Sequence, residues 1–511
     1  MTSAAPDAWA APGAVLLVST YELGRQPFNV ASPWAQLEAA GFGVDGVDTA
    51  VAELDDTALA RARLVAISVP MHTALRLGVE VARRVRRVAP TAHLTMFGLY
   101  ASLNARYLLE AHADSVIGGE FEVALVELAR QLAHDATSDG RLAADRPPRS
   151  FAIEGVVTDV GSLDGGLVAP TTLRKLPFMV PRRDRLAPPA RYAKLLGPSP
   201  GQTRRVGYVE ATRGCLHTCR HCPITPVYQG RFFAVPRDVV LADAEQQVRE
   251  GAEHLTFGDP DFFNGPKHGL AILETLHARH PELSFDVTIK VEHLLRERAS
   301  VPKLARLGCA FVISAVESLS DEVLRRLDKG HTRADVAEAL AICQDAGVAM
   351  RPSLMPFTPF ATLEDYVELC DWIAREELVD AVDPVQLSIR LLVPPGSAML
   401  AGAESRPWLG ELVLEDFGHR WSHPDPRMDA LHREVARLCE ARADEDAGGT
   451  FLAIRELAYQ KAGRTAPAVS LTRRFVPRLS ESWFCCAEPP QRLVRAIASC
   501  DSQGVCSTGR G

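Results

Sequence analysis

Three cysteines close together in the middle of the chain are the residues best suited to do chemistry. Cys215, Cys219 and Cys222 follow a C-x3-C-x2-C spacing in the segment GCLHTCRHC, directly after the apolar run VGYVEA at 206–211. Thiolates this close on one loop can bind a single iron–sulfur cluster. They supply three ligands where a four-iron cluster needs four. The spacing therefore predicts a [4Fe–4S] cluster with one iron open to another molecule.

A zinc site is the alternative for these thiols. No further Cys or His follows downstream at the usual zinc spacing. His217 and His221 lie inside the loop itself, too close in sequence to complete a tetrahedron easily. The iron–sulfur interpretation is therefore favoured. The isolated cysteines elsewhere are expected to be small buried hydrophobes: Cys309, Cys343, Cys370 and Cys439.

The composition narrows the class of protein. The chain has 511 residues, 47% of them hydrophobic and 23% charged, which is enough for two or three globular domains. A net charge of −8 argues against a nucleic-acid partner, which would require a basic face. The sequence contains neither a membrane-length apolar run nor a secretion signal, so we expect no membrane partner and a cytoplasmic location. In that compartment clustered cysteines indicate metal or redox chemistry rather than disulfides.

Residues 1–135 alternate short apolar runs with helical patterns. Strand–helix alternation predicts a doubly wound parallel sheet, which binds ligands at the carboxyl ends of its strands. The expected strands are 14–19, 64–69, 93–97 and 115–117, and the expected helices are 34–40, 73–88, 105–111 and 122–132.

The rest of the chain divides into three regions with different sequence patterns. Residues 136–200 are rich in Pro, Arg, Gly and Asp and predict an ordered linker. Residues 201–395 show six strand–helix units, which predict a barrel with its functional residues on the loops after the strands. Residues 396–511 are expected to be mainly helical, notably 428–443 and 451–462, with an irregular tail that contains Cys485, Cys486, Cys500 and Cys506.

The cluster loop and the strand before it resemble those of the radical S-adenosylmethionine (SAM) superfamily. This resemblance implies a partial (β/α)6 barrel of the TIM type, in which SAM binds the fourth iron through its amino and carboxylate groups. One electron, from a donor such as flavodoxin or ferredoxin, would then release a 5′-deoxyadenosyl radical. The cofactor performs the difficult step, and the protein holds the radical near its target.

The resemblance also implies residues that contact SAM. His221 matches a position near the adenine, and Gly258 with Asp259 loosely match the turn whose backbone takes the amino group. Asp259 and Asp261 are equally interpretable as loop carboxylates that cap the next helix. Glu317 and Ser318 match the strand end that contacts the ribose.

Two further matches have structural alternatives. Arg351 is a candidate partner for the SAM carboxylate, or else a member of a salt bridge. Leu392, with its neighbours Leu391 and Val393, falls where the adenine is usually sandwiched, but these residues also suit a plain barrel core.

Residues 1–135 resemble the cobalamin-binding, Rossmann-like domain that precedes the barrel in many radical SAM enzymes. The matching pieces are YELGRQPFNVASPWAQLEAAGF, FGLYASL and GGEFEVALVEL. The cobalt-ligating D-x-H-x-x-G signature of other cobalamin domains is absent. The resemblance implies cobalamin as a cofactor. The alternative is a flavodoxin-like domain that has lost its cofactor or that only shapes the active site.

The tail segment CCAEP resembles the signature of a subgroup of radical SAM proteins with CUAEP or CCAEP tails. In that subgroup selenocysteine can replace the second cysteine. This implies a nucleophilic, redox or soft-element-binding role for Cys485 and Cys486, which are therefore our catalytic candidates. An idle, disordered tail is the alternative, and Cys500 and Cys506 are open to either interpretation.

These features together predict an enzyme that modifies a small molecule, by methyl transfer with SAM and cobalamin. One alternative is a cobalamin-independent transferase. It would move a SAM fragment, or form a carbon–heteroatom bond, on an arsenic, selenium or sulfur acceptor held by the tail cysteines. An alternative of another class is a non-catalytic cobalamin or redox sensor.

Overall fold

The computed structural model describes residues 7–138, 151–163, 168–173, 176–199, 201–401 and 406–481. These residues form two compact units. The first contains the described residues up to Leu186 except 23–26, and the second contains Leu23–Gln26 and the residues from Ala187 onward. The division therefore falls within the stretch 136–200, and residues 151–186 belong to the first unit.

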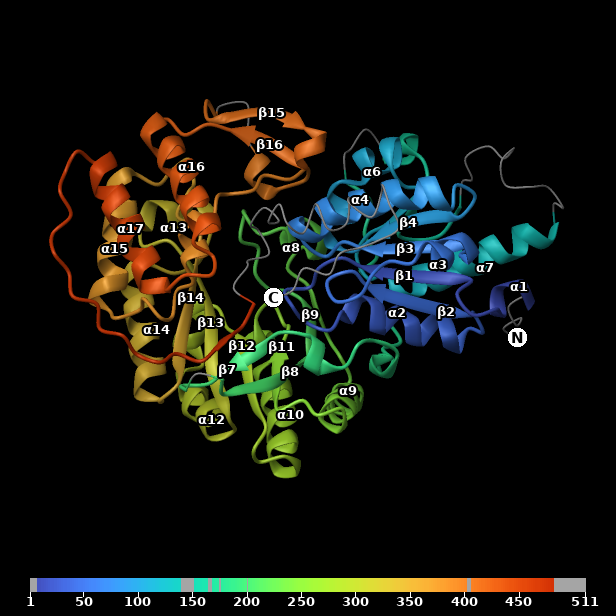
Figure 1. Cartoon of the computed structure of the whole chain (residues 1–511), viewed down its shortest axis with the longest axis horizontal. Helices are drawn as coiled ribbons and strands as arrows, with labels where there is room; N and C mark the ends of the chain where they lie inside the picture. Colours follow the sequence, from blue (N-terminus) through green and yellow to red (C-terminus); the bar gives the residue numbers. More distant parts are fainter. Residues whose placement is uncertain are drawn as a thin grey trace. The chain divides into compact units, whose positions relative to one another are not determined.

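The first unit is built on a six-stranded sheet with the order β2-β1-β3-β4-β5-β6 (Figure 1). All neighbouring strands are parallel except β6, which is antiparallel to β5. The strands are β1 (Val15–Ser19), β2 (Val44–Asp48), β3 (Leu64–Ser68), β4 (His93–Phe97), β5 (Ser115–Ile117) and β6 (Val156–Val157). The helices are α1 (Asp7–Ala10), α2 (Phe28–Ala39), α3 (Asp56–Arg61), α4 (His72–Val88), α5 (Leu99–Leu103), α6 (Ala105–Ala111) and α7 (Glu122–Ser138).

Both faces of this sheet are covered, because every residue of β1 and β3 is buried. Ala66 belongs to the hydrophobic cluster formed with α2 and α7. On α4, Gly78 lies against Ile67 and Met96, which explains the absence of a side chain there. Successive strand residues point to opposite faces, so α4 covers the face opposite α2 and α7. The predicted doubly wound domain is confirmed.

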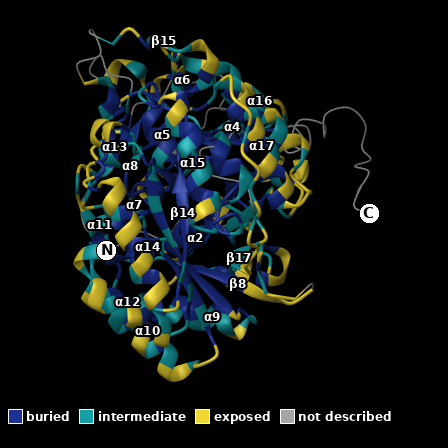
Figure 2. Cartoon of the chain, turned by 90° about the vertical axis from the view of Figure 1, so that its left-hand side faces the viewer, coloured by how far each residue is buried: buried dark blue, intermediate teal, exposed yellow. Residues whose placement is uncertain are grey.

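The second unit contains a seven-stranded sheet with the order β14-β13-β12-β11-β8-β7-β17. Its strands β8, β11, β12, β13 and β14 are parallel and are joined through helices, which is the arrangement of a partial barrel. Figure 2 shows β14 as a buried strand, whereas α10 and α12 of the same unit carry exposed residues. The parallel strands are β8 (Thr203–Val209), β11 (His254–Phe257), β12 (Ser284–Thr288), β13 (Cys309–Glu317) and β14 (Ala349–Leu354).

Short antiparallel strands and outer helices complete the barrel region. β7 and β17 extend the sheet beside β8, and β9 pairs with β10 around the cysteine loop. These strands are β7 (Lys194–Leu196), β9 (Thr212–Gly214), β10 (Phe232–Ala234) and β17 (Arg478–Leu479). The helices are α8 (Ile224–Tyr228), α9 (Arg237–Arg249), α10 (Pro266–Arg279), α11 (Val291–Arg296), α12 (Val301–Arg306), α13 (Asp321–Leu327), α14 (Arg333–Asp345) and α15 (Leu363–Arg375).

The sixth barrel strand, predicted at 385–394, differs from the expectation. Residues Pro384–Ser388 form a 3-10 helix, and only Arg390 makes a parallel bridge, to Phe357. Pro384 has no backbone N–H to donate to a ladder, which favours the helical start. Beyond it lie a hairpin and two helices. They are β15 (Leu409–Val413), β16 (Gly418–Trp421), α16 (Pro426–Ala441) and α17 (Ala447–Lys461). The two predicted C-terminal helices are confirmed, and the hairpin was not predicted.

Candidate functional site

The cysteine loop follows β8 and β9 and is closed by the β9–β10 hairpin. The Cys215 amide donates to the carbonyl of Arg231, and the Thr225 hydroxyl donates to the carbonyl of Cys219. Gly214 has a φ of 79°, and a Cβ there would lie 2.5 Å from the Arg231 oxygen. This turn therefore requires glycine. From the loop after β11, the amide oxygen of Asn264 accepts from the Leu216 N–H and lies 4.0 Å from Cys215 Sγ.

The three loop thiols are unbonded and largely withdrawn from water. Cys219 is buried, and Cys215 and Cys222 are half-buried. Burial raises the pKa of Cys215 to about 11 and that of Cys222 to about 12, and the proximity of Cys219 raises both pKa values further. The Cys215 and Cys222 thiols are therefore protonated near neutral pH when nothing is bound. Such a group favours a cationic metal centre that stabilises the thiolates.

The loop after β11 supports the cysteine loop through a buried carboxylate. Asp259 accepts from the Ala211 amide at 3.0 Å and from the Thr212 hydroxyl at 2.6 Å. Burial raises the pKa of Asp259 to about 6, despite these hydrogen bonds. Gly258 lies against Tyr208, where a Cβ would meet the phenol oxygen at 1.8 Å. The structure thus gives both residues a packing role in addition to the predicted contact with a cofactor.

A buried ion pair lies at the end of β13, beside the cysteine loop. Glu317 Oε1 lies 3.2 Å from Lys329 Nζ and 3.4 Å from His221 Nε2. Burial opposes ionisation of Glu317, but Lys329 and His221 outweigh it and hold the pKa of the carboxylate near 2. The charge of Glu317 raises the pKa of Lys329 against the effect of burial. Glu317 is also held at φ 63°, a strained conformation for this residue.

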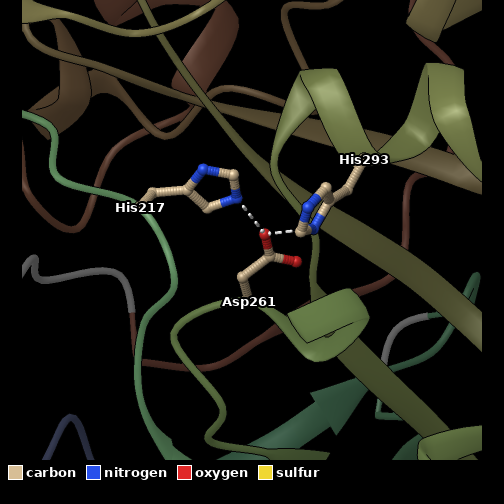
Figure 3. A group of neighbouring side chains, drawn as sticks. All are labelled: His217, Asp261 and His293. Carbon is tan, nitrogen blue, oxygen red and sulfur yellow. Dashed lines mark ion pairs between the residues drawn. The ribbon is translucent and has the colours of Figure 1, made fainter. Parts of the chain in front are cut away.

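A second charged group joins the cysteine loop to the ends of two strands (Figure 3). His217 Nε2 lies 3.3 Å from Asp261 Oδ2, and His293 Nδ1 lies 2.7 Å from the same oxygen. Asp261 also caps a 3-10 turn by accepting from the Phe263 amide, as the capping interpretation predicted. Burial would raise the pKa of Asp261, but the two imidazoles hold it near 2.

The remaining predicted residues have clear surroundings. Ser318 is buried, and its hydroxyl accepts from the Ser320 amide. Arg351 forms an ion pair with Asp383 at 2.8 Å and donates to the Asp380 carbonyl. Leu392 is half-buried. Cys485 and Cys486, together with Cys500 and Cys506, lie outside the described residues.

Several residues near the cysteine loop were not identified from the sequence. Lys290, His293 and Lys329 belong to no motif of the sequence, and His217 was considered only as an unsuitable zinc ligand. Asp261, the partner of His293, lies in the loop after a different strand. The available signal was positional, because Lys290 and His293 directly follow β12 and Lys329 follows the helix after β13.

Most of the barrel region matches a known protein family. Residues 209–373 match the family model described as the Radical SAM superfamily. The chain contains a radical SAM domain. The match begins at the last residue of β8 and covers the cysteine loop, the ion pair and the histidine–aspartate group.

Curated relatives of the radical SAM domain are distant. The chain is 22% identical over 313 residues to bacteriochlorophyllide d C-8(2)-methyltransferase of Chlorobaculum tepidum, covering 58% of this chain and 60% of that protein. It is 24% identical over 186 residues to ribosomal protein uS12 methylthiotransferase RimO of Porphyromonas gingivalis, covering 33% and 41%. The chain thus spans less than two thirds of these relatives.

Two solved structures share the fold across the radical SAM domain and beyond it. One is the radical SAM methyltransferase TsrM from Kitasatospora setae, solved with cobalamin and a [4Fe-4S] cluster. Its TM-score is 0.58 at 19% identity, covering 77% of this chain and 76% of that one. The other is the cobalamin-dependent SAM radical enzyme OxsB with aqua-cobalamin, with a TM-score of 0.64 at 14% identity, covering 85% and 67%. The fold class predicted from the sequence is confirmed.

Proposed function

We propose that this chain is a radical SAM enzyme that methylates a small molecule with the help of cobalamin. Cys215, Cys219 and Cys222 would hold the [4Fe–4S] cluster. The observation that carries the proposal is the presence of three unbonded thiols within eight residues on one loop of a radical SAM domain. Methyl transfer is supported by the shared fold of the methyltransferase TsrM, and cobalamin by the shared fold of both TsrM and OxsB.

The residues around the thiols fit a cluster and a bound nucleoside. When bound, the cluster, SAM and cobalamin supply one-electron cleavage of a sulfur–carbon bond and a carrier for the methyl group. The chain keeps the thiols away from water and places the buried Lys329 ammonium beside Cys219 and Cys222. A cation there stabilises thiolates, which the cluster requires. Glu317 and His221 present polar groups on the same side, suited to ribose hydroxyls and to an adenine edge.

The first unit has a polar group that fits a cofactor at the ends of its strands. The hydroxyls of Ser19, Ser68 and Thr49 are buried and find no hydrogen-bond partner among the described residues. Ser19 and Ser68 are adjacent in the register of β1 and β3, where the strand order reverses. Ligands of doubly wound sheets bind at this place. We infer that the orphaned hydroxyls contribute to a cobalamin site.

Other parts of the proposal rest on the sequence alone. A flavodoxin or ferredoxin would supply the electron, the location would be cytoplasmic, and Cys485 and Cys486 of the CCAEP tail would take part in the chemistry. No helix among the described residues is long and apolar enough to cross a membrane. If cobalamin is not bound, the cobalamin-independent transferase is the second candidate, supported by this tail.

The test is anaerobic reconstitution followed by assay with SAM and a reductant. We expect about four irons per chain, and we expect S-adenosylhomocysteine or 5′-deoxyadenosine to form. Cys219→Ala should lose both the iron and the products. Cys343→Ala, which changes a buried cysteine away from the loop, should retain them. A reconstituted wild type that never cleaves SAM would refute the enzymatic proposal and favour the sensor.

A separate measurement tests the cobalamin site. Ser19→Ala with Ser68→Ala should reduce the cobalamin retained after gel filtration without lowering the thermal midpoint, because the lost hydroxyls have no partner in the described structure. Ser162→Ala, on a 3-10 turn of the same unit, is the control. Equal retention by all variants would show that these hydroxyls do not bind cobalamin.

A further inference from the structure

A group of three side chains beside the cysteine loop has the composition of a metal site. His217 comes from the cysteine loop, Asp261 from the loop after β11, and His293 from α11, after β12 (Figure 3). One ligand atom from each residue can be chosen so that all three atoms lie within 4.8 Å of one another. Two imidazole nitrogens and one carboxylate oxygen form a donor set typical of zinc or ferrous iron.

The ligand atoms are buried and do not satisfy one another. Nε2 of His217, Oδ2 of Asp261 and Nδ1 of His293 are all shielded from water, and none has a hydrogen-bond partner of acceptable geometry among the described residues. The short separations of 3.3 Å and 2.7 Å therefore bring three polar atoms together without directional bonding. Leaving three such atoms buried is costly, and a cation among them would remove that cost.

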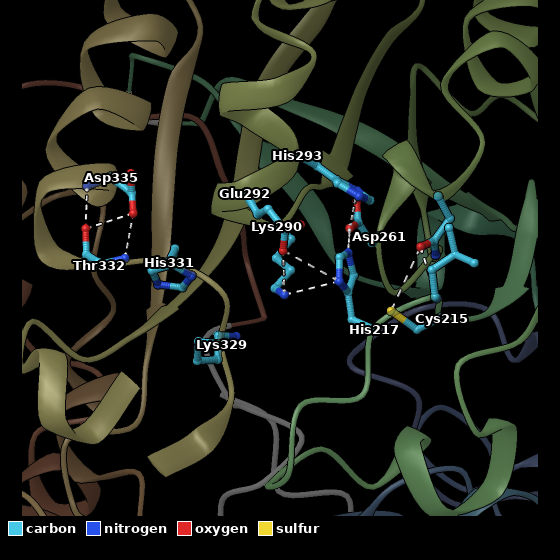
Figure 4. A network of polar contacts seen from close by, with 12 residues as sticks. Cys215, His217, Asp261, Lys290, Glu292, His293, Lys329, His331, Thr332 and Asp335 are labelled. Atoms are coloured by element: carbon cyan, nitrogen blue, oxygen red, sulfur yellow. Dashed lines mark hydrogen bonds and ion pairs between the residues drawn. The ribbon is translucent and has the colours of Figure 1, made fainter. Parts of the chain in front are cut away.

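The surroundings of His217 also fit a bound cation. Lys290 Nζ lies 3.1 Å from His217 Nδ1, and both nitrogens lie near the carboxylate of Glu292, at 3.1 Å and 3.8 Å from Oε2 (Figure 4). In the metal-free chain Lys290 can donate to Nδ1. When a metal binds Nε2 of His217, the imidazole proton must lie on Nδ1. The Glu292 carboxylate is then the nearby acceptor for this proton, and it keeps its ion pair with Lys290. A carboxylate behind a ligating histidine is the usual support for such a ligand.

We propose that His217, Asp261 and His293 bind one divalent transition-metal ion, zinc or ferrous iron, in addition to the iron–sulfur cluster. Three protein ligands leave at least one coordination position for water or another donor. Because His217 lies between Cys215 and Cys219, the ion would fix the cysteine loop to the ends of β11 and β12. The site uses no cysteine, so it is distinct from the proposed cluster.

The first test is metal analysis of the full chain with its cluster reconstituted, so that the loop thiols are already occupied. After dialysis against zinc and removal of free metal, we expect about one zinc per chain beyond the cluster iron. His293→Ala and Asp261→Asn should lower zinc affinity by at least about 100-fold. His277→Ala, a half-buried histidine on α10, should bind zinc like the wild type. The same analysis after isolation without added zinc shows whether the resident ion is zinc or an extra iron.

Two outcomes would overturn the proposal. One is a wild type that binds no zinc beyond the cluster at micromolar free metal, and the other is equal zinc binding by wild type and His293→Ala. If the variants fail to fold, the wild type still decides the question. Zinc must then raise its thermal midpoint, since a ligand that binds only the folded state stabilises it. An unchanged midpoint would also refute the site. A chain that binds zinc but does not cleave SAM would refute only the proposed function.

Discussion

Replacing Glu317 by glutamine would remove one charge from the ion pair beside the cysteine loop. The carboxylate lies 3.2 Å from Lys329 Nζ, and the exposed fractions of the two side chains are 13% and 3%. Glutamine has nearly the same shape, so the main change is a buried ammonium left without its counter-ion. Breaking a buried pair in this way costs about 3–5 kcal/mol.

The pKa of Glu317 gives a second value for the free energy that its charge contributes to folding. It is held near 2 in the folded chain, against 4.5 for a glutamate in the unfolded chain. A depressed pKa means that the charged form stabilises the fold above pH 4.5 and that this contribution is lost as the pH falls toward 2. The difference corresponds to about 3 kcal/mol. Both arguments predict a fall in thermal midpoint of roughly 5–8 °C at pH 7 for the second unit, which spans about 300 residues.

The assay is thermal denaturation of the cluster-free chain, followed by circular dichroism. Glu322→Gln is the matched control, because Glu322 pairs with Arg325 and Arg326 on the surface of α13, where such pairs are worth about 0–1 kcal/mol. Glu317→Gln with Lys329→Met should recover part of the loss, since both charges are removed. A Glu317→Gln variant no less stable than Glu322→Gln would refute the reasoning.

Three further predictions concern the same barrel. Asp259 has its pKa raised to about 6, so its contribution to stability falls as the pH rises from 4 to 6, and Asp259→Asn should flatten that part of the pH–stability curve in denaturation experiments. Gly258→Ala should destabilise the chain by about 1–3 kcal/mol in urea unfolding, because the new Cβ meets Tyr208; an unchanged midpoint would contradict that packing. Arg351→Met should lower the thermal midpoint, because it breaks the ion pair with Asp383. Titration of this variant with SAM separates the structural role of Arg351 from the predicted contact with SAM. An unchanged affinity for SAM would exclude a contact with the SAM carboxylate.

Local sequence patterns were sufficient to predict those strands and helices whose formation depends mainly on residues close together in the chain. The alternation of apolar runs and helical periodicity predicted β1, β3 and α4, because strands buried on both faces have continuous apolar sequences. β2 was not predicted, because its sequence VDGVD is only partly apolar and is half-buried at the sheet edge. The sixth barrel strand was wrongly predicted for the opposite reason: its apolar run supports a buried 3-10 turn as well as a strand.

The sequence by itself predicted the proposed cluster site, because the three thiols lie within eight residues and their spacing alone brings them onto one loop. Only the tertiary structure placed Asp261 between His217 and His293, and Lys329 against Glu317. The first group joins residues that follow β8, β11 and β12, and the second joins the end of β13 to the turn after α13. The order of the strands brings their carboxyl ends together, and no local pattern in the sequence encodes that order.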